Sequence, residues 1–497
     1  MRTIESDSDS KVRILIHCPQ CGGDIDFLEE AQVIHCQFCG SSLLVAGREG
    51  ALRYVIPAQI RNAPEAQSQA LEYLRGLGRH SPRPGEAFLF YVPFWRMQGT
   101  VYRWVFGMKP MKVESTCGLP PPMERMKVLL TRRMDHSIPG YAGLQVGLST
   151  LGIRTQVLRV LTLNREPLEQ REFFLPLEIP LERVQEETER YSQLFFEGDE
   201  VVPEVVLHRI VGKIFSVVYF PIWWVEGHHR EGQESVLIDA VGKSALSSKI
   251  DRPSLLAKLA APEDRQSFEF NEVRFLPFRC PNCGWEFSFQ SLSVLHFCVN
   301  CRRLWREKGG EWGEMGYGVV TPPEAQARND LLWVPFWCWR AVLESGGEKI
   351  STMADLYRMA PPPRVIHPER EAQKPIFFYI PAVKFRNPLI SQHLASRLTF
   401  IRPEMTLQAF PDGSHPLTAG GSYPQRDALD LGPIILGALI PQNNRRARTW
   451  LKGCRVDLQD PQIFYFPFAK ADLFWKGLAT GISFQQNALS EDLTSLK

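Results

Sequence analysis

The sequence predicts a strand-rich α+β protein built from two related halves, each opening with a four-cysteine zinc ribbon. Two cysteine quartets share the spacing C-x2-C-x14-C-x2-C, which is typical of zinc ribbons. Short segments that follow the first quartet recur after the second, and an aromatic-x-Pro pattern runs through both halves. These three observations predict an internal duplication, with two like domains packed about a pseudo-two-fold axis.

The length and composition of the chain favour several globular units. With 497 residues, of which 44% are hydrophobic, the chain can bury more than one core. We expect a disordered N-terminus at 1–12, zinc ribbons at 13–50 and 272–312, and α+β repeat domains at 51–255 and 313–497. The net charge of +2 provides no global basic field that would attract nucleic acid or anionic lipid.

The sequence predicts neither export nor a membrane span. Its first eleven residues lack the apolar stretch of a signal peptide, so we expect a cytoplasmic protein. Two apolar runs stand out, at 210–225 and 431–440. The first contains Lys213 and Pro221 and the second is too short to cross a bilayer, so we interpret them as buried strands or a short core helix.

Each cysteine quartet is a complete ligand set for one zinc ion. Every C-x-x-C places two thiolates on one tight turn, and two such turns close a tetrahedron with Zn–S distances of about 2.3 Å. Four thiolates leave no position for water or substrate, so we predict two structural zinc ions per chain. The ligands of the first ribbon are Cys18, Cys21, Cys36 and Cys39, and those of the second are Cys280, Cys283, Cys298 and Cys301.

The residues around the ligands are those expected for metal-binding turns. Three of the four C-x-x-C turns are followed by Gly, which tolerates a left-handed conformation, whereas Arg302 follows the fourth. His17, His35 and His296 lie beside ligands, but the complete quartets make them neighbours of the metal sites rather than ligands. Disulfide pairing, the alternative use of these cysteines, would need an oxidising compartment.

The internal repeat extends well beyond the ribbons. Six short matches define it: residues 54–57 with 317–320, 64–67 with 323–326, 91–95 with 333–337, 138–139 with 380–381, 151–154 with 394–397, and 219–221 with 465–467. The offset falls from 259 to 242 residues between the second and the third match. We therefore expect the stretch 68–77 of the first half, which reads as part of a helix, to lack a counterpart in the second half.

The aromatic-x-Pro pattern predicts strands that carry an aromatic ring, a proline and an apolar residue on one face. Because proline cannot donate a ladder hydrogen bond, we expect these strands at sheet edges or bulged at the proline. Their rings either pack beneath the neighbouring half, which we favour, or remain exposed to bind a partner strand. The pattern occurs at Tyr91/Pro93/Trp95, Tyr219/Pro221/Trp223, Trp333/Pro335/Trp337, Tyr379/Pro381/Val383 and Tyr465/Pro467/Ala469.

Helices and loops complete the expected elements. Amphipathic or capped stretches predict helices over 63–77, 181–196 and 254–261. Proline and glycine clusters predict loops at 118–122, 361–363 and 411–424.

The sequence contains no recognisable catalytic motif, so we expect a protein that is not an enzyme. Walker A, G-x-S-x-G, H-E-x-x-H and G-x-G-x-x-G patterns are all missing. The nearest polar groupings are Glu226, His228, His229 and Asp239, read as a solvated turn, and the pair Asp135–His136, for which the sequence identifies no partner. Three cysteines lie outside the quartets, Cys117, Cys338 and Cys454, and a buried inert thiol is expected for Cys338.

Nucleic-acid binding is the main alternative to a purely structural role for the ribbons. The second ribbon carries Arg302, Arg303, Arg306 and Lys308 around Trp305, a pattern that suits phosphate contacts and base stacking. Residues 1–50 argue against it, because eight acidic residues there outnumber four basic ones. Since counterion release requires a basic face, we do not favour this alternative.

The order of these features resembles uncharacterised bacterial zinc-ribbon proteins that are often labelled as similar to the primosomal replication helicase. The resemblance is carried by the C-P-x-C-G ribbons, the Y-x-x-P segment at 54–57, the following helix and the Y-x-P-F-W strand at 91–95. Because the ATPase motifs are missing, it implies a bacterial zinc-binding protein and no helicase activity. We expect a non-catalytic scaffold or adaptor for protein partners; the alternatives are a nucleic-acid-binding accessory protein and an enzyme with an unrecognised site.

Overall fold

A computed structural model describes residues 12–490, apart from the segments 48–49, 112–121, 149–158, 163–172, 197–200, 247–249, 262–269, 326–327, 329, 363–367, 404–409 and 411–415. Residues 1–11 of the predicted disordered N-terminus, most of the predicted loop at 118–122, parts of those at 361–363 and 411–424, and Cys117 therefore lie outside the described residues, whereas Val12 is described and buried.

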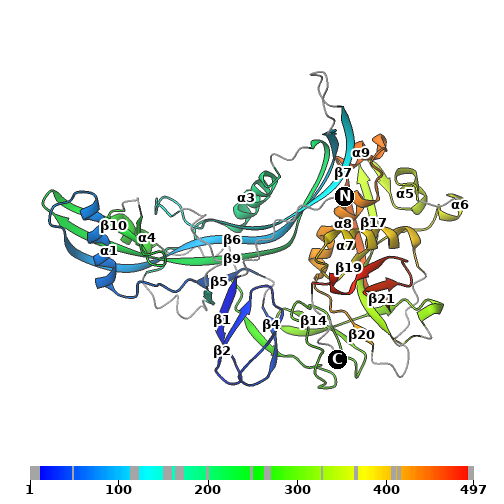
Figure 1. The fold of residues 1–497 in the computed structure, drawn as a ribbon, viewed down its shortest axis with the longest axis horizontal. Helices are drawn as coiled ribbons and strands as arrows, with labels where there is room; N and C mark the ends of the chain where they lie inside the picture. The colour runs from blue at the N-terminus through cyan, green and yellow to red at the C-terminus, as the bar shows by residue number, and fades with distance from the viewer. Residues whose placement is uncertain are drawn as a thin grey trace.

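The first half is organised around a nine-stranded mixed sheet with two exceptionally long strands (Figure 1). Strand β6 pairs with β9 along most of its length and with β7 on its other side. The remaining strands follow β9 in the order β11-β10-β9-β5-β8-β1-β2. The bounds are β1 Arg13–His17, β2 Asp24–Leu28, β5 Leu52–Val55, β6 Arg83–Pro110, β7 Met123–Pro139, β8 Arg159–Thr162, β9 Val202–His229, β10 Gly232–Asp239 and β11 Ser244–Leu246.

The second half has an eight-stranded sheet built around β17 and β21, and two small sheets belong to the ribbons. The large sheet consists of β16 Tyr317–Val319, β17 Leu331–Ser345, β18 Glu348–Ile350, β19 Ile376–Pro381, β20 Leu417–Thr418, β21 Arg455–Ala471, β22 Phe474–Gly477 and β23 Ser483–Gln485. One small sheet joins β3 Val33–His35, β4 Ser42–Ala46 and β12 Arg274–Pro277; the other joins β13 His296–Phe297, β14 Leu304–Lys308 and β15 Glu311–Met315.

The helices pack against these sheets, and the strand-rich α+β class is confirmed. The three predicted helices form within a few residues of their expected bounds, and Asn62 and Asp251 cap the first and third. Further helices form in the second half, and no described helix is long and apolar enough to span a membrane. The bounds are α1 Ala63–Gly76, α3 Leu181–Leu194, α4 Arg252–Leu259, α5 Met353–Met359, α6 Pro368–Glu371, α7 Pro388–Ile401, α8 Gln425–Leu439 and α9 Arg445–Leu451, with short 3-10 turns η3 Pro323–Ala325 and η4 Gln486–Ala488.

The two sheets share their strand register around the aromatic-x-Pro pattern. Tyr91 lies opposite Pro221 as Trp333 lies opposite Pro467, and Trp95 lies opposite Ile138 as Trp337 lies opposite Ile380. Strand β5 also runs parallel to β9, and strand β16 runs parallel to β21 in the same way. In this register Val55 pairs with Tyr219 and Val319 pairs with Tyr465, so the predicted match of residues 54–57 with 317–320, which sets Val55 against Gly318, is displaced by one residue.

At four of the five motifs the proline lies where one neighbouring strand ends and another begins, so the prediction of edge or bulged strands is wrong there. It holds for Pro381, which ends β19, because β19 pairs with β17 alone among the described strands. Beside β6, the carbonyl of Pro93 accepts a hydrogen bond from Gly140 just beyond β7 (2.9 Å), while the carbonyl of Tyr91 accepts one from Leu175 of a different segment (2.9 Å). Pro335 in β17 lies in the same kind of gap, between β19 and β20. Each of these prolines lacks an N–H at a point where one neighbouring strand has ended and the next has not begun. The sheet therefore loses no hydrogen bond there.

The aromatic rings of these strands are buried, as favoured. Trp95, Tyr219, Trp337 and Tyr465 are all nearly inaccessible to solvent. The indole N–H groups of Trp95 and Trp337 donate to backbone carbonyls that directly precede the proline N-caps of α3 and α8.

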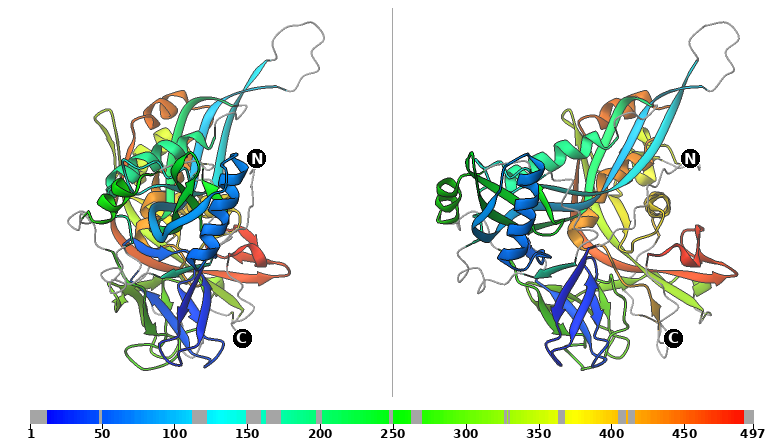
Figure 2. Two further views of the ribbon diagram at one scale, coloured as in Figure 1. Left: turned by 90° about the vertical axis from the view of Figure 1, so that its left-hand side faces the viewer. Right: turned by 60° about the vertical axis from the view of Figure 1, so that its left-hand side comes forward.

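The far ends of β6, β7 and β9, which we call the arm, cross onto helices α8 and α9 of the second half (Figures 1 and 2). The Trp104 indole N–H donates to the Ile434 carbonyl at 2.8 Å. The Lys127 ammonium donates to the carbonyls of Ala438 and Ile440, at 2.8 and 2.7 Å, where α8 ends. The arm thus caps α8 and joins the two halves through a common hydrophobic core.

Candidate metal centres

Both cysteine quartets come together as the spacing predicts. In each, the four sulfur atoms lie within 4.8 Å of one another, and among the described residues these two are the groups of Cys, His, Asp or Glu close enough to hold a metal ion. The Sγ–Sγ distances are 3.9 Å for Cys18–Cys39 and 3.7 Å for Cys21–Cys36, and 3.5 Å for both such pairs in the second quartet. Sulfurs of a zinc tetrahedron stand about 3.8 Å apart, so both sites fit this ion.

All four C-x-x-C turns have the same backbone hydrogen bonds. The residue after each turn donates its N–H to the carbonyl of the turn's first cysteine, as Gly22 does to Cys18 at 2.9 Å. That residue has a left-handed φ in every case: 73° at Gly22, 74° at Gly40 and Gly284, and 58° at Arg302. The repeated geometry presents two sulfurs per turn on one side, as a tetrahedral site requires.

Arg302 occupies a conformation that glycine would adopt more easily, and its contacts explain how it is held there. Its guanidinium donates to the Phe410 carbonyl at 2.9 Å, and its own carbonyl accepts from the Tyr317 hydroxyl at 2.9 Å. The left-handed conformation costs about 1–2 kcal/mol for a residue with a Cβ. The two hydrogen bonds that Arg302 makes to residues of the second half contribute a stabilising free energy large enough to offset that cost.

Hydrogen bonding favours the thiolate at one cysteine of each ribbon. Contacts with the side chain and backbone of Ser41 lower the pKa of Cys39 to about 6. Contacts with the Asn300 side chain and the Trp285 backbone lower the pKa of Cys283 to about 6. Burial raises the pKa of Cys280 and of Cys298 in the second quartet, and the pKa of Cys21 in the first is raised to about 12. Since thiolates rather than thiols bind zinc, a zinc ion would displace the protons of these thiols on binding.

The two ribbons pack directly against each other. Strand β4 of the first ribbon pairs antiparallel with β12, which leads into the second. Val33 and Leu44 of the first ribbon are buried in one cluster with Phe278, Phe287 and other residues of the second. The carbonyl of Ser291 also accepts hydrogen bonds from the N–H groups of Gln32 and Val33, at 2.6 and 3.1 Å. The two metal centres therefore belong to one packed unit at the junction of the halves (Figure 1).

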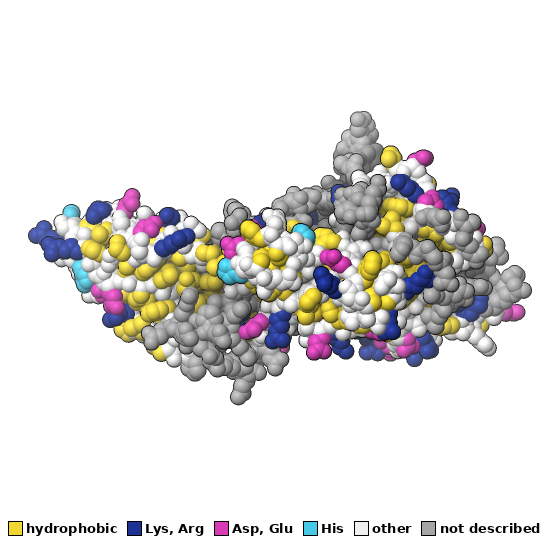
Figure 3. Space-filling view, turned by 90° about the horizontal axis from the view of Figure 1, so that it is seen from below, with side chains coloured by type: hydrophobic (Ala, Val, Ile, Leu, Met, Phe, Trp, Pro, Cys, Tyr) yellow, Lys and Arg dark blue, Asp and Glu magenta, His cyan; other side chains and the backbone are white. Residues whose placement is uncertain are grey.

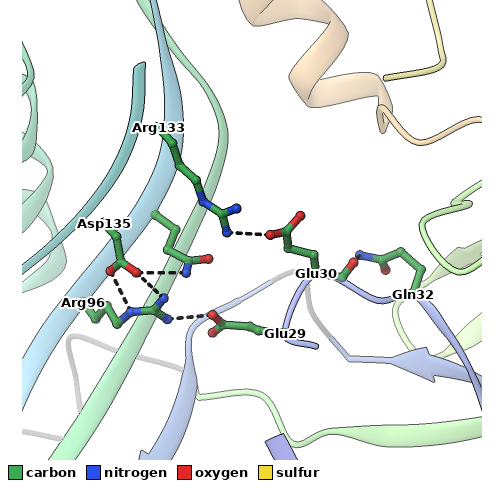
Figure 4. A network of polar contacts seen from close by, with 7 residues as sticks. Glu29, Glu30, Gln32, Arg96, Arg133 and Asp135 are labelled. Atoms are coloured by element: carbon green, nitrogen blue, oxygen red, sulfur yellow. Dashed lines mark hydrogen bonds and ion pairs between the residues drawn. The ribbon is translucent and has the colours of Figure 1, made fainter. Parts of the chain in front are cut away.

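A buried ionic network fastens the first ribbon to the long strands (Figure 4). The Arg96 guanidinium is 1% exposed and lies 2.6 Å from Glu29 and 2.7 Å from Asp135. Burial alone would lower the pKa of Arg96, but the two carboxylates outweigh it and raise that pKa. Glu30 pairs with Arg133 beside this network. Sequence reasoning missed the network; an arginine between Trp95 and Met97 in an apolar strand was the available signal.

The other polar groupings singled out in the sequence have structural partners. Glu226 pairs with His228 at 3.2 Å, while His229 contacts Glu231 at 2.8 Å. Asp239 accepts hydrogen bonds from the backbone of the turn that follows β10, so it does not join these histidines in a common site. Asp135 belongs to the Arg96 network, and the ring of His136 stacks on Tyr191 at 3.7 Å.

The neighbouring histidines and the two leftover cysteines that the structure describes do not extend the metal sites. His17 contacts Asp24 at the surface, and burial lowers the pKa of His296 to about 3 among aromatic rings. Burial raises the pKa of Cys338 to about 12, in keeping with an unreactive thiol. His35 and Cys454 lie outside both described quartets.

The residues predicted as a nucleic-acid patch do not form one surface. Trp305 is 8% exposed and belongs to the core shared by the ribbons, so its ring is not available to stack on a base. Arg303 pairs with Glu314 at 2.9 Å, and the guanidinium of Arg306 donates to Gln425 at 3.2 Å. Lys308 remains exposed. On the described part of the face in Figure 3, basic, acidic and apolar side chains are interspersed.

Comparison of the chain with protein-family models, with curated proteins and with solved structures finds no match, so its function has to be inferred from these two centres and the surfaces around them.

Proposed function

We propose that the protein is a non-catalytic, zinc-dependent scaffold that assembles protein partners in the cytoplasm. Two closed tetrathiolate centres lie in ribbons that pack against each other where the halves meet. This shared joint is the observation that carries the proposal. When bound, each zinc ion would cross-link two turns of its ribbon and so stabilise the joint.

We infer further that the chain arose by duplication of one ribbon followed by one α+β domain, with a pseudo-two-fold relation between the copies. The shared register of β6, β7 and β9 with β17, β19 and β21 supports this inference. So do the proline caps of α3 and α8, each preceded by a carbonyl that accepts a tryptophan N–H. Where the first half has α1, the second has only the short turn η3 among its described residues. The proposed family remains the bacterial zinc-ribbon proteins that the motifs resemble.

A nucleic-acid-binding role is the second candidate, and we rank it lower because the stacking residue it requires, Trp305, is buried. Residues 1–50 also contain eight acidic residues against four basic ones. An enzymatic role ranks lower still, because Glu226, Asp239 and His136 from the polar groupings singled out in the sequence are engaged in an ion pair, a turn and a ring contact.

The decisive experiment is affinity purification of the tagged full chain from its native host, with and without nuclease. A scaffold should retain the same protein partners after nuclease treatment, and removal of zinc by a chelator should release them. Partners that disappear with nuclease would support the nucleic-acid role instead. Conversion of a substrate by the metal-loaded protein would overturn the non-catalytic proposal.

A further inference from the structure

The arm leaves the rest of its sheet at a bulge that contains glycine on both strands. The pairing of β6 with β9 shifts between Gln98 and Thr100, which leaves Gly99 outside the regular register. Gly212 on β9, at the same bulge, has a left-handed φ of 70°. Beyond this point the arm crosses onto α8 (Figure 1). Because a bulge bends its strand and small residues absorb changes of φ and ψ, this position is suited to act as a hinge for the arm.

A buried carboxylate of α8 faces this bulge. Asp427, in the first turn of the helix, is 7% exposed, and a Cβ atom on Gly212 would lie 3.5 Å from its Oδ2. Within the part of the chain that the structure describes, its side chain has no hydrogen bond and no ion pair closer than 4 Å. The nearby hydroxyls of Tyr102 on the arm and Tyr423 before α8 contact each other at 3.3 Å. The docked arm therefore covers a carboxylate with which it does not pair, and this disfavours the charged form.

Cations lie near Asp427 but are engaged with other groups. Arg426 donates to the backbone carbonyl of Lys213 at 3.1 Å. The Lys384 ammonium lies over the ring of Tyr423, 5.5 Å from its centre. None of these three cations forms an ion pair with the carboxylate, so they act on it only from a distance.

Burial outweighs these cations and favours the protonated carboxyl. Burial is the largest influence on the pKa of Asp427, which is raised above its usual 3.8, and Asp430, one turn later on α8, adds to the rise. Burial raises the pKa of Asp430 in the same way. The cations that act on this pair are Lys384 after β19, Arg426 on α8, and Arg209 and Lys213 on β9.

Two other groups of the arm titrate in the opposite sense. Burial and nearby cations lower the pKa of His208 to about 4, but its ring contacts Ser192 of α3 at 2.7 Å, within the first half. Burial lowers the pKa of Lys127 to about 8, which is above the range in which carboxylates titrate. A comparison of two variants of Asp427 at one pH cancels both of these contributions.

We propose that the arm is a proton-linked latch, whose docking onto α8 takes up protons at Asp427 and Asp430, so that acid fastens it and neutral pH leaves it poised to open. A carboxyl group with a raised pKa in the docked state binds more protons there than in the open state, from pH 3.8 up to the raised value. Docking therefore weakens as the pH rises through that interval. The ribbons form a separate junction, so the halves stay together when the arm opens. The latch goes beyond the scaffold function and does not depend on it.

Hydrogen exchange followed by mass spectrometry tests the latch on the zinc-loaded full chain. Peptides from α8 and β7 report opening of the arm, and peptides from α1 serve as an internal reference. Asp427→Asn keeps the shape of the side chain but holds it uncharged. At pH 7.5 it should slow the exchange of α8 and β7 at least about threefold relative to the unaltered chain, and this difference should shrink as the pH falls to about 4.5. Zinc content is measured at each pH, and samples are compared at equal zinc content.

A second variant and a matched control accompany this comparison. Asp430→Asn should slow the exchange of α8 less than Asp427→Asn does, because Asp430 is less buried. Asp472→Asn makes the same charge change at the exposed turn between β21 and β22 and should leave exchange unchanged; asparagine tolerates the left-handed φ of 48° found there. On the unaltered chain, the exchange of α8 relative to α1 should slow as the pH falls from about 7.5 to about 4.5, which tests the latch without any variant.

The latch is rejected if Asp427→Asn leaves the exchange of α8 unchanged or speeds it at pH 7.5, because the ionised side chain would then not oppose docking. A difference of the same size at every pH would assign the effect to packing and not to a proton. Equal slowing in α1 would assign it to the stability of the whole chain, and equal slowing by Asp472→Asn to net charge; either result overturns the proposal. None of these results bears on the partners retained in affinity purification, so the scaffold function stands or falls separately.

Discussion

Replacing Cys283 by serine should weaken zinc binding in both ribbons, because the ribbons share one core. Loss of the second zinc would loosen the surroundings of Phe278 and Phe287. Val33 and Leu44 of the first ribbon, now 1% and 2% exposed, are buried against those residues. Full burial of such a side chain contributes about 1.5–3 kcal/mol, so partial exposure of both costs the first ribbon about 3 kcal/mol. That energy corresponds to about a hundredfold loss of zinc affinity at the intact first site.

A chelator competition that reports released zinc measures this coupling. The single zinc of Cys283→Ser should be released at about a hundredfold lower chelator concentration than either zinc of the unaltered chain. Cys454→Ser, which changes a cysteine outside both quartets, serves as the matched control and should keep both ions. If the single zinc of Cys283→Ser is released at the concentration that releases one of the wild-type ions, the two centres are independent and the shared-core reasoning fails.

Further predictions concern the metal, the buried cations and the shared core. Elemental analysis and X-ray absorption should find two zinc ions per chain with four sulfur ligands each; iron, or disulfides without metal, would contradict this. Arg96→Met should lower the free energy of unfolding by about 3–5 kcal/mol in urea titrations, since it leaves two buried carboxylates without their partner; an unchanged midpoint would show that the network is dispensable. Burial lowers the pKa of Lys127 to about 8 from its usual value of 10.5. Between these two values the unfolded chain holds the extra proton, so Lys127 makes stability rise with pH there, and Lys127→Met should flatten that rise relative to the unaltered chain. Trp305→Ala should lower the thermal midpoint, as expected for a core residue, whereas a folded variant that has lost only nucleic-acid binding would revive the nucleic-acid role.

The metal centres were predictable from the sequence because their geometry is local. Each C-x-x-C turn sets its own sulfur positions, and the spacing between turns repeats, so the eight ligands could be named without knowing the fold. Features that depend on pairing between distant segments of the chain could not be predicted in this way. Whether Pro93 lies at an edge depends on where β7 ends, and that is set by tertiary structure.

Helix α8 and the Arg96 network show the same limit. The apolar run 431–440 was interpreted as a buried strand or a short core helix, and it forms the second half of α8. Pro433 and two glycines lie inside α8, where local propensity opposes a helix, so the sequence alone did not decide between the two. The partners of Arg96 are Glu29, 67 residues earlier in the chain, and Asp135, 39 residues later. The sequence next to Arg96 therefore does not indicate either partner. Trp305 was predicted to stack on bases from its basic neighbours, but packing between the ribbons buries it.

The arm also has a consequence for biosynthesis. Trp104 leaves the ribosome 330 residues before Ile434, the residue whose carbonyl its indole N–H will bind. At a translation rate of about 5–20 residues per second, the apolar side of the arm remains uncovered for roughly 15–70 s before α8 is synthesised. During that time the nascent first half exposes a surface that invites association with other nascent chains. Translation speed over the second half, and chaperones that shield the arm meanwhile, should therefore govern how much of this protein reaches its native state.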